Sequence, residues 1–574
     1  MLQEEIKKLE QVCRNLEGCI REGLSWVKEN VPEENQKAIV YNLKKYNRTN
    51  RRYRQALGKR PAVTIFGESQ VGKSYLVSNL AVKPGESNML ILDPSTDTTI
   101  DFIKEMNPKG GGAEATGLVS RFTIINNFKE GQPPFVLKLL SNADVVKIIC
   151  NGYLSDLMQY SYKIDREEVA NRLRKIKEKT LPAEQPGFSE DDVYELKEYL
   201  NHNFKDHFII KELNDINYWD DISAIIPYLP NEERFTVFEV IWGTREFLTE
   251  LFRNLTGILK QVEFSSEVRG YKEALTPQEQ TILDVTRLSE YFMENISQKP
   301  VEVVLPGGSK IQANRSLITA VIAEVVLLLP PETAEAPNRG FLKSADILDF
   351  PGARSRKKIP EAIFLANSKV EKLEIFLRGK IAFLFDRYTY EHEISTLLFC
   401  LHEKQSEVQD IPHLLYEWIR VSHGASPEER EKREQNLKLL IGDADIERIN
   451  PLLVVFTKFN IELTGSPSDK VGDPSSHDAK WTARFKRNFN EFMSPNVGDK
   501  WANQWTTSET DFKNCFLLRD PKFSKAVYTG LDSDNEGLET AINPNYVQRM
   551  DDMTESFLEH GYVKKHFDAH LLWM

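Results

Sequence analysis

A stretch of eight residues, GESQVGKS at positions 67–74, constrains the fold more than any other part of this sequence. It fits the pattern GxxxxGK(S/T) at every position. An apolar, β-prone run at 62–66 precedes it, and a helix-prone run at 75–80 follows it. Strand, glycine loop and helix in this order predict a loop whose backbone N–H groups point inward around a chain of phosphates. The alternative is a glycine turn with a buried lysine.

Each position of this loop has a physical role in the expected phosphate site. Gly72 avoids a Cβ clash at the tightest point, Lys73 reaches the β- and γ-phosphates, and the Ser74 hydroxyl ligates Mg²⁺. The positive end of the following helix points at the phosphates. We therefore expect a nucleoside triphosphate and Mg²⁺ as ligands. The nucleotide-binding candidates are Gly67, Glu68, Ser69, Gln70, Val71, Gly72, Lys73 and Ser74.

Composition narrows the classes of function. The 574 residues, 41% hydrophobic and 28% charged, are typical of a soluble globular chain of two to four domains. A net charge of −12 disfavours nucleic acid as a partner. Five scattered cysteines without a CxxC pair favour a reducing cytoplasm. The charged first helix is unlike a signal or transit peptide, and no apolar run is long enough to cross a bilayer, so membrane contact would be peripheral.

Periodicity divides the chain into five segments. Residues 1–60 form polar helices, and residues 61–143 hold the strand, the loop and the next helix. Residues 144–300 are mostly helical in pattern and highly charged, which predicts an all-helical insertion. Strand-like runs separated by helices return at 301–530, and residues 531–574 form a C-terminal helical segment. Alternating strands and helices predict an α/β domain with a mostly parallel sheet.

The end of the first segment is basic. Residues 47–60 contain several arginines and lysines. We interpret them as a solvated helix face. A patch that binds phosphate or anionic lipid is the alternative.

A second motif, ILDFPG at 347–352, ends a short strand-like run. Asp349 would hold the Mg²⁺ shell, usually through water, and the backbone N–H of Gly352 would meet the γ-phosphate. Arg354 follows closely and is a candidate catalytic cation that neutralises transition-state charge. An ordinary loop and a solvated basic segment are the alternatives for these residues.

A third motif, TKFN at 457–460, follows the apolar run 452–456. It resembles the guanine-reading pattern (N/T)KxD, so Thr457, Lys458 and Asn460 are candidates for binding the base. The last position of that pattern is normally an aspartate, which accepts hydrogen bonds from two guanine donors. The NH₂ group of Asn460 would face a donor, and one buried unmatched donor costs roughly 1–3 kcal/mol. GTP is the first expectation, and ATP or weak base discrimination stays open.

A glycine-rich stretch at 108–117 precedes the run LVSRFT. A mobile loop that carries hydroxyl groups suits a switch that closes over the γ-phosphate and Mg²⁺. Thr116, Ser120 and Thr123 are the candidates for this role. A plain flexible loop is the alternative.

Together, GESQVGKS, ATGLVSRFT, DFPG and TKFN resemble the motifs of the dynamin-like large GTPases. In that family the second motif reads like GIVTR, so the resemblance implies that Ser120 ligates Mg²⁺, with Thr116 in reserve. The longer wording GESQVGKSYLVSNL, GGGAEATGLVSRFT and ILDFPGAR is closer to the SrfC-type putative bacterial virulence factors, over residues 61–130 and 343–354. The resemblance implies a P-loop G domain interrupted by the helical insertion.

The resemblance also implies an activity. The chain would be a Mg²⁺-dependent NTPase, GTP-using by first expectation, that hydrolyses the γ-phosphate to drive conformational change or self-assembly. Lys73 and Ser120 would act in catalysis. Ser69 stands where dynamins commonly carry a catalytic glutamine, with Gln70 next to it. A nucleotide-gated scaffold with negligible hydrolysis and an ATPase are the alternatives. The implied partners are a second copy across the nucleotide face, unidentified proteins and a membrane surface.

Overall fold

The structure is a computed structural model. It describes residues 2–69, 71–107, 116–158, 162–243, 245–277, 281–284, 300–354, 356, 358–361, 369–401, 411–441, 450–457, 474–493, 500–508, 511–518 and 554–567. The chain forms two compact units. Unit 1 comprises Met1–Ala62, Ser78–Pro351 and Arg356–Glu393, and unit 2 comprises Val63–Val77, Gly352–Ser355 and Ile394–Met574.

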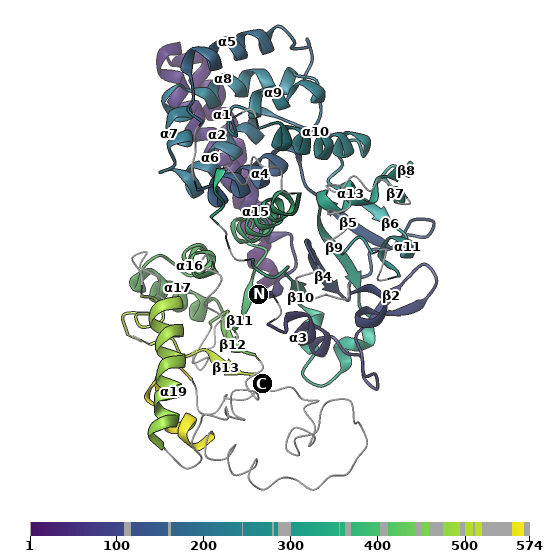
Figure 1. Ribbon diagram of the computed structural model, residues 1–574, viewed down its shortest axis with the longest axis vertical. Helices are drawn as coiled ribbons and strands as arrows, with labels where there is room; N and C mark the ends of the chain where they lie inside the picture. Colours follow the sequence, from purple (N-terminus) through teal and green to yellow (C-terminus); the bar gives the residue numbers. More distant parts are fainter. Residues whose placement is uncertain are drawn as a thin grey trace. The chain divides into compact units, whose positions relative to one another are not determined.

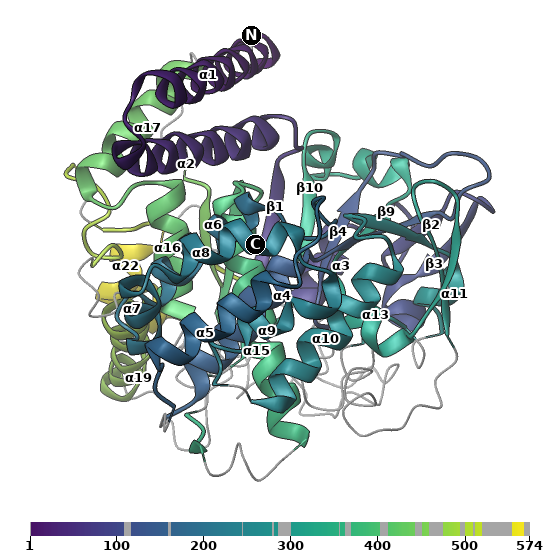
Figure 2. The ribbon, with the colours of Figure 1, turned by 90° about the horizontal axis from the view of Figure 1, so that it is seen from above.

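Unit 1 begins with a hairpin of two long helices, α1 (Leu2–Asn30) and α2 (Glu33–Leu57). Figures 1 and 2 both show them lying side by side. Asn50 Nδ2 donates to the Cys13 carbonyl at 2.7 Å, which joins the two helices. The basic end of α2 was predicted to be a solvated face, and Arg51 is 44% exposed there, but Arg48 is an exception. Arg48 is 2% exposed and its guanidinium bonds Asp191 and Glu198 of α6 (Glu190–Phe204), because α6 is correspondingly acidic.

Helices make up most of the next part of unit 1. Ser141 and Ser189 start α4 (Asn142–Asp156) and α6 with capping boxes, in which the serine side chain and an acidic residue three positions later satisfy each other's backbone N–H groups. The remaining helices are α5 (Arg166–Lys177), α7 (Phe208–Asp215), α8 (Tyr218–Ile225), α9 (Phe235–Phe238), α10 (Glu246–Gln261), α11 (Lys272–Leu275), α13 (Arg315–Val321) and α15 (Lys369–Tyr390). Short π and 3-10 turns lie at Phe102–Met106, Ile226–Tyr228, Asn231–Glu233, Pro331–Glu335 and Gly340–Lys343.

The helices α4 (Asn142–Asp156) and α15 cross closely because each has a glycine at the crossing. A Cβ on Gly379 would lie 2.4 Å from the Ile148 carbonyl oxygen, and a Cβ on Gly152 would lie 2.5 Å from the Ile375 carbonyl oxygen. Any side chain there would force the two backbones apart.

The strands of unit 1 form a mixed arrangement in the order β10-β4-β9-β5-β6-β7-β8. Strand β4 runs parallel to β9 and antiparallel to β10, and β5 to β8 form antiparallel pairs. The bounds are β4 (Val119–Thr123), β5 (Phe135–Leu139), β6 (Glu267–Gly270), β7 (Val301–Val304), β8 (Lys310–Ala313), β9 (Ile322–Leu328) and β10 (Asp346–Asp349). A separate hairpin pairs β2 (Leu90–Asp93) with β3 (Thr98–Asp101).

Strand β6 corrects one prediction. It lies inside 144–300, which was expected to be all-helical, and it pairs with β5 and β7. Its sequence, EVRG, has one large apolar residue, Val268, so it shows no strand periodicity of its own. The hydrogen bonds of its neighbours determine its conformation.

The described residues of unit 2 include four parallel strands in the order β13-β12-β11-β1. They are β1 (Ala62–Gly67), β11 (Thr396–Leu401), β12 (Leu452–Phe456) and β13 (Cys515–Leu517). Its helices are α3 (Lys73–Leu80), which starts in this unit, α16 (Ile411–Ser422), α17 (Pro427–Ile441), α19 (Pro474–Lys486), which leads into a π turn at Arg487–Phe492, and α22 (Gly561–His566). The rings of Phe456, Phe485 and Phe567 pack together beside β12.

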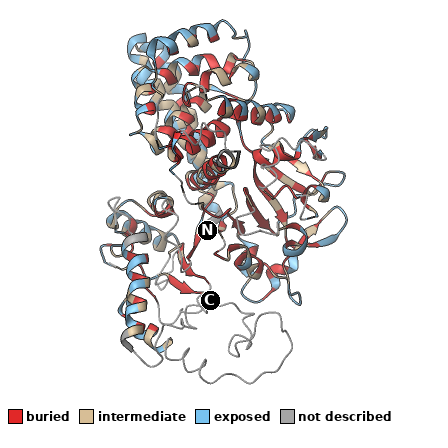
Figure 3. Cartoon of the chain, in the orientation of Figure 1, coloured by how far each residue is buried: buried red, intermediate tan, exposed pale blue. Residues whose placement is uncertain are grey.

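Burial follows the strands in both units. Figure 3 shows many buried strand residues in each unit, and in unit 1 helix α4 is buried along nearly its whole length. Among the helices of the described residues, none has the length and apolarity that a membrane span requires.

Candidate functional site

The glycine loop lies between β1 and α3 in unit 2. Leu76 N donates to the Gly72 carbonyl at 3.0 Å and starts the helix directly after the loop. Gly72 has φ +96°, a left-handed conformation that a side chain would strain. At the start of the loop, a Cβ on Gly67 would lie 2.4 Å from the Cys400 carbonyl oxygen, because β11 runs alongside. Both glycines of the motif are therefore required by the local backbone.

Lys73 is buried, with 4% of its surface exposed. Its Nζ donates to the Glu68 carbonyl at 2.6 Å, so the side chain folds back over the loop. Val71 is buried as well, and within the described part of the chain the buried Ser69 Oγ has no hydrogen-bond partner. Gln70 lies outside the described residues.

The segment after the DFPG motif is attached to the start of the loop. Ala353 N donates to the Gly67 carbonyl at 3.0 Å, and Ala353 forms a parallel bridge with Glu68. Gly352 and Arg354 flank this anchored residue. The structure thus places two more predicted site residues, Gly352 and Arg354, next to a residue that is hydrogen-bonded to the glycine loop.

Thr457 directly follows β12 in the same unit. Its N and its Oγ1 both donate to the Leu401 carbonyl, at 2.9 and 3.1 Å, and the residue is 2% exposed. Because β1, β11 and β12 are parallel, the glycine loop and Thr457 follow the same edge of these strands, with β11 between them. Lys458 and Asn460 lie outside the described residues.

In unit 1 the structure brings together two of the predicted Mg²⁺ residues. Ser120 of β4 is directly opposite Asp349 of β10 in the antiparallel register. Opposite residues of an antiparallel pair have their side chains on the same face. Both residues are buried, at 4% and 8% exposure.

The other two hydroxyl candidates lie elsewhere in unit 1. Thr116 forms an isolated bridge with Asp284, outside β4. Thr123 is three positions from Ser120, so it points to the opposite face of β4. There its Oγ1 accepts a hydrogen bond from Ile125 N at 3.1 Å. Of the three predicted hydroxyl candidates for the Mg²⁺ role, the strand register therefore favours Ser120 over Thr116 and Thr123.

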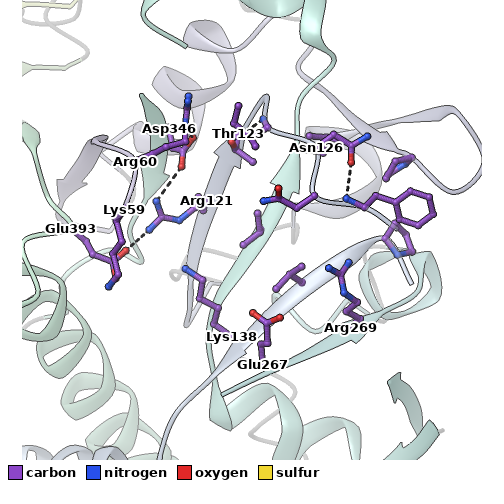
Figure 4. A pocket seen from close by; sticks show the side chains of 18 residues that line it. Lys59, Arg60, Arg121, Thr123, Asn126, Lys138, Glu267, Arg269, Asp346 and Glu393 are labelled. Carbon is purple, nitrogen blue, oxygen red and sulfur yellow. Dashed lines mark hydrogen bonds and ion pairs between the residues drawn. The ribbon is translucent and has the colours of Figure 1, made fainter. Parts of the chain in front are cut away.

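Sequence reasoning missed a buried ion cluster around Arg121, the residue after Ser120. Arg121 Nε and Nη2 donate to the two carboxylate oxygens of Glu324 at 2.8 and 3.1 Å. Its guanidinium also bonds Asp346 at 3.3 Å and Glu393 at 2.5 Å. Figure 4 shows the contacts to Asp346 and Glu393 as dashed lines. A signal was available, because Glu324 interrupts the most apolar run of the sequence, and a carboxylate there needs a cation.

The chain belongs to the family of putative bacterial virulence factors. The family model matches residues 23–573, nearly the whole chain. No curated protein matches the chain. The description of this virulence factor family states no ligand and no reaction, so an assignment of chemistry depends on the residues described above.

In this member of the virulence factor family, the positive and negative charges of the Arg121 cluster compensate one another. Glu324 is fully buried, and burial alone would raise its pKa. The charges of Arg121 and of Lys138, whose Nζ lies 2.6 Å from the carboxylate, outweigh burial and lower the pKa to about 2. Burial alone would lower the pKa of Arg121. The charge of Glu324 and its hydrogen bonds outweigh burial, so the pKa of Arg121 is raised. Glu324 and Arg121 therefore stay charged at neutral pH, and their ion pair has a structural role.

Proposed function

We propose that this chain is a Mg²⁺-dependent P-loop nucleoside triphosphatase, with GTP as the preferred substrate, whose turnover drives conformational change or self-assembly. The observation that supports this most is the geometry of the glycine loop. Gly72 has the positive φ that lets the loop curl, and Lys73 lies folded over it with its Nζ on the Glu68 carbonyl. A phosphate oxygen can take the place of that carbonyl as the acceptor.

The arrangement of unit 2 gives further support. Ligands of parallel α/β sheets bind beyond the carboxyl ends of the strands. The glycine loop and Thr457 follow such ends, and Ala353 holds Gly352 beside the start of the loop. Phosphate and base contacts would then come from neighbouring loops of one unit.

The residues present also fit Mg²⁺, which prefers hydroxyl, carboxylate and water oxygens. Within unit 1, Ser120 offers a hydroxyl and Asp349 a carboxylate that would bind it through water, and within unit 2 Ser74 offers a hydroxyl. The opposition of Ser120 and Asp349 in the strand register fits this role. When bound with a triphosphate, Mg²⁺ neutralises charge on the β- and γ-phosphates.

The proposed reaction is an in-line displacement. A water oxygen forms a bond to the γ-phosphorus as the bond to the bridging oxygen breaks, giving a nucleoside diphosphate and inorganic phosphate. Lys73 would neutralise the charge that develops on the phosphoryl oxygens, and the Gly352 N–H would donate to one of them. Ser69 and Gln70 would position the water, and Arg354 would add a further positive charge.

Release of phosphate tests the proposal. Lys73→Ala should lower the rate of GTP hydrolysis by about 10²–10³-fold, the usual effect of removing one stabilising donor. Lys104→Ala is the matched control, because that side chain is 72% exposed and lies in unit 1. Hydrolysis that is equal in wild type and in Lys73→Ala contradicts an enzymatic role for the loop.

A nucleotide-gated scaffold is the second candidate, favoured by Ser69 in the place of a catalytic glutamine. A scaffold would bind GTP and a non-hydrolysable analogue equally well and recruit partners without phosphate release that depends on Lys73. Binding measured by calorimetry beside the release assay separates the two candidates.

Preference for GTP over ATP depends on Asn460. An aspartate in its place would accept from two guanine donors, so Asn460→Asp should increase the affinity for GTP relative to ATP by about 10- to 100-fold. No gain in this ratio would mean that TKFN does not read the base.

A further inference from the structure

Unit 1 has a pocket on the face of its strands that carries Arg121. Figure 4 shows the residues that line it. The cavity has a volume of about 320 Å³. Strands β4, β9, β5 and β6 contribute alternate residues to it, so these side chains share one face. The pocket contains no residue of the glycine loop and does not depend on the proposed nucleotide site.

The interior of the pocket is partly apolar. Val136, Val326 and Leu328 come from neighbouring strands and form an apolar surface. Phe128 lines the pocket from the loop between β4 and β5, and its N–H donates to Asn126 Oδ1 at 2.9 Å. A ligand of this size would bury an aliphatic or aromatic group there.

Most charged residues of the lining are already paired. Arg121 binds Glu324, Asp346 and Glu393. The remaining pairs of this cluster are Lys59 with Glu393 at 2.6 Å, Arg60 with Asp346 at 2.9 Å, and Lys138 with Glu324 at 2.6 Å.

Two charged residues of the lining, Glu267 and Arg269, differ from the others in their partners. Glu267 and Arg269 are two positions apart on β6, and Figure 4 shows both side chains directed from that strand into the pocket. Arg269 donates to the Pro133 carbonyl at 3.3 Å. Among the described residues, neither of the two forms an ion pair. Lys138 is opposite Glu267 in the register, but its ammonium is directed to Glu324.

We propose that this pocket binds an α-amino acid with an apolar side chain. Arg269 offers a fork of N–H donors that matches a carboxylate, and Glu267 offers an acceptor for an ammonium group. Their Cα atoms are about 7 Å apart, as for any two residues i and i+2 of a strand, so two long side chains can converge on the two charges of one small zwitterion. The side chain of the ligand would lie against Val136, Val326 and Leu328.

Titration with L-leucine, followed by saturation-transfer NMR, tests the proposal on the full chain. L-leucine should bind, and L-leucinamide and N-acetyl-L-leucine, which each lack one charge, should bind about tenfold more weakly or worse. This comparison needs no substitution in the protein. Failure of L-leucine to bind, or equal binding of the three compounds, would overturn the proposal.

Variants test which group of the ligand each of the two charged residues binds. Arg269→Gln and Glu267→Gln should each weaken L-leucine by about 10- to 100-fold. In Arg269→Gln, L-leucine and L-leucinamide should bind alike, because the partner of the carboxylate is gone. Arg253→Gln and Glu246→Gln are matched controls from an exposed pair on α10, 3.3 Å apart, and should leave binding unchanged. Binding of L-leucine that neither pocket variant alters would overturn the assignment.

Discussion

Two buried cations, Lys73 and Arg121, lie in two of the four motifs that resemble those of dynamin-like GTPases, and they have different hydrogen-bond partners. Lys73 is 4% exposed and Arg121 is 7% exposed. Lys73 donates to a backbone carbonyl five positions earlier in the same loop. Arg121 binds three carboxylates that lie 203, 225 and 272 positions away in the sequence.

The difference indicates how each cation is used. A carbonyl in the same loop can be exchanged for a phosphate oxygen without moving any distant element. Three carboxylates from separate elements fix the Arg121 guanidinium and are themselves fixed by it. Substitution of Lys73 should therefore change ligand binding, and substitution of Arg121 should change stability.

The largest expected effect breaks the Arg121 cluster. Arg121→Ala would leave buried carboxylates without their cation, which costs about 3–5 kcal/mol of unfolding free energy. Urea unfolding of the purified variant measures this loss. Arg253→Ala, at an exposed pair, should cost under about 1 kcal/mol. Equal losses in the two variants would show that the cluster does not stabilise unit 1.

A smaller effect is expected in the glycine loop. Gly72→Ala must adopt φ +96° at a cost of about 1–2 kcal/mol, or relax the loop away from its phosphate-binding shape. We expect affinity for a GTP analogue to fall about tenfold, measured by calorimetry. Gly58→Ala is the control, because Gly58 has φ −84° and tolerates a side chain. An unchanged affinity in Gly72→Ala would argue against a tightly curled loop.

A further effect in the Arg121 cluster is the pH dependence of Glu324. Its folded pKa of about 2 lies below the ordinary value of 4.5, so the stabilisation by its charge is present above pH 4.5 and is lost as the pH falls towards 2. The stability difference between wild type and Glu324→Gln should therefore shrink across this window, as urea unfolding at successive pH values would show. A difference that stays constant with pH would contradict the depressed pKa.

The local sequence pattern was sufficient to predict the glycine loop and the strand and helix that flank it. The run at 62–66 and the run at 452–456 each have enough consecutive apolar residues to predict β1 and β12, and GxxxxGK(S/T) predicts the loop between β1 and α3. These features depend on neighbours a few residues apart. The opposition of Ser120 and Asp349 was not visible in the sequence, because it depends on strand register.

Features with distant partners could not be predicted. Strand β6 has only Val268 as an apolar signal, and it becomes a strand because β5 and β7 lie on either side. Arg48 looked solvated in a basic helix, but the acidic face of α6, more than 140 positions later, buries it. Both cases need tertiary contacts that periodicity does not encode.

Calorimetric titration of wild type and Lys73→Ala with a non-hydrolysable GTP analogue, Mg²⁺ being present, tests nucleotide binding by the glycine loop most directly. We predict binding to wild type and at least about a 10- to 100-fold loss of affinity in Lys73→Ala, as for a lost charge-assisted hydrogen bond. Absence of binding to wild type, for both this analogue and its ATP counterpart, would contradict a nucleotide site in this chain.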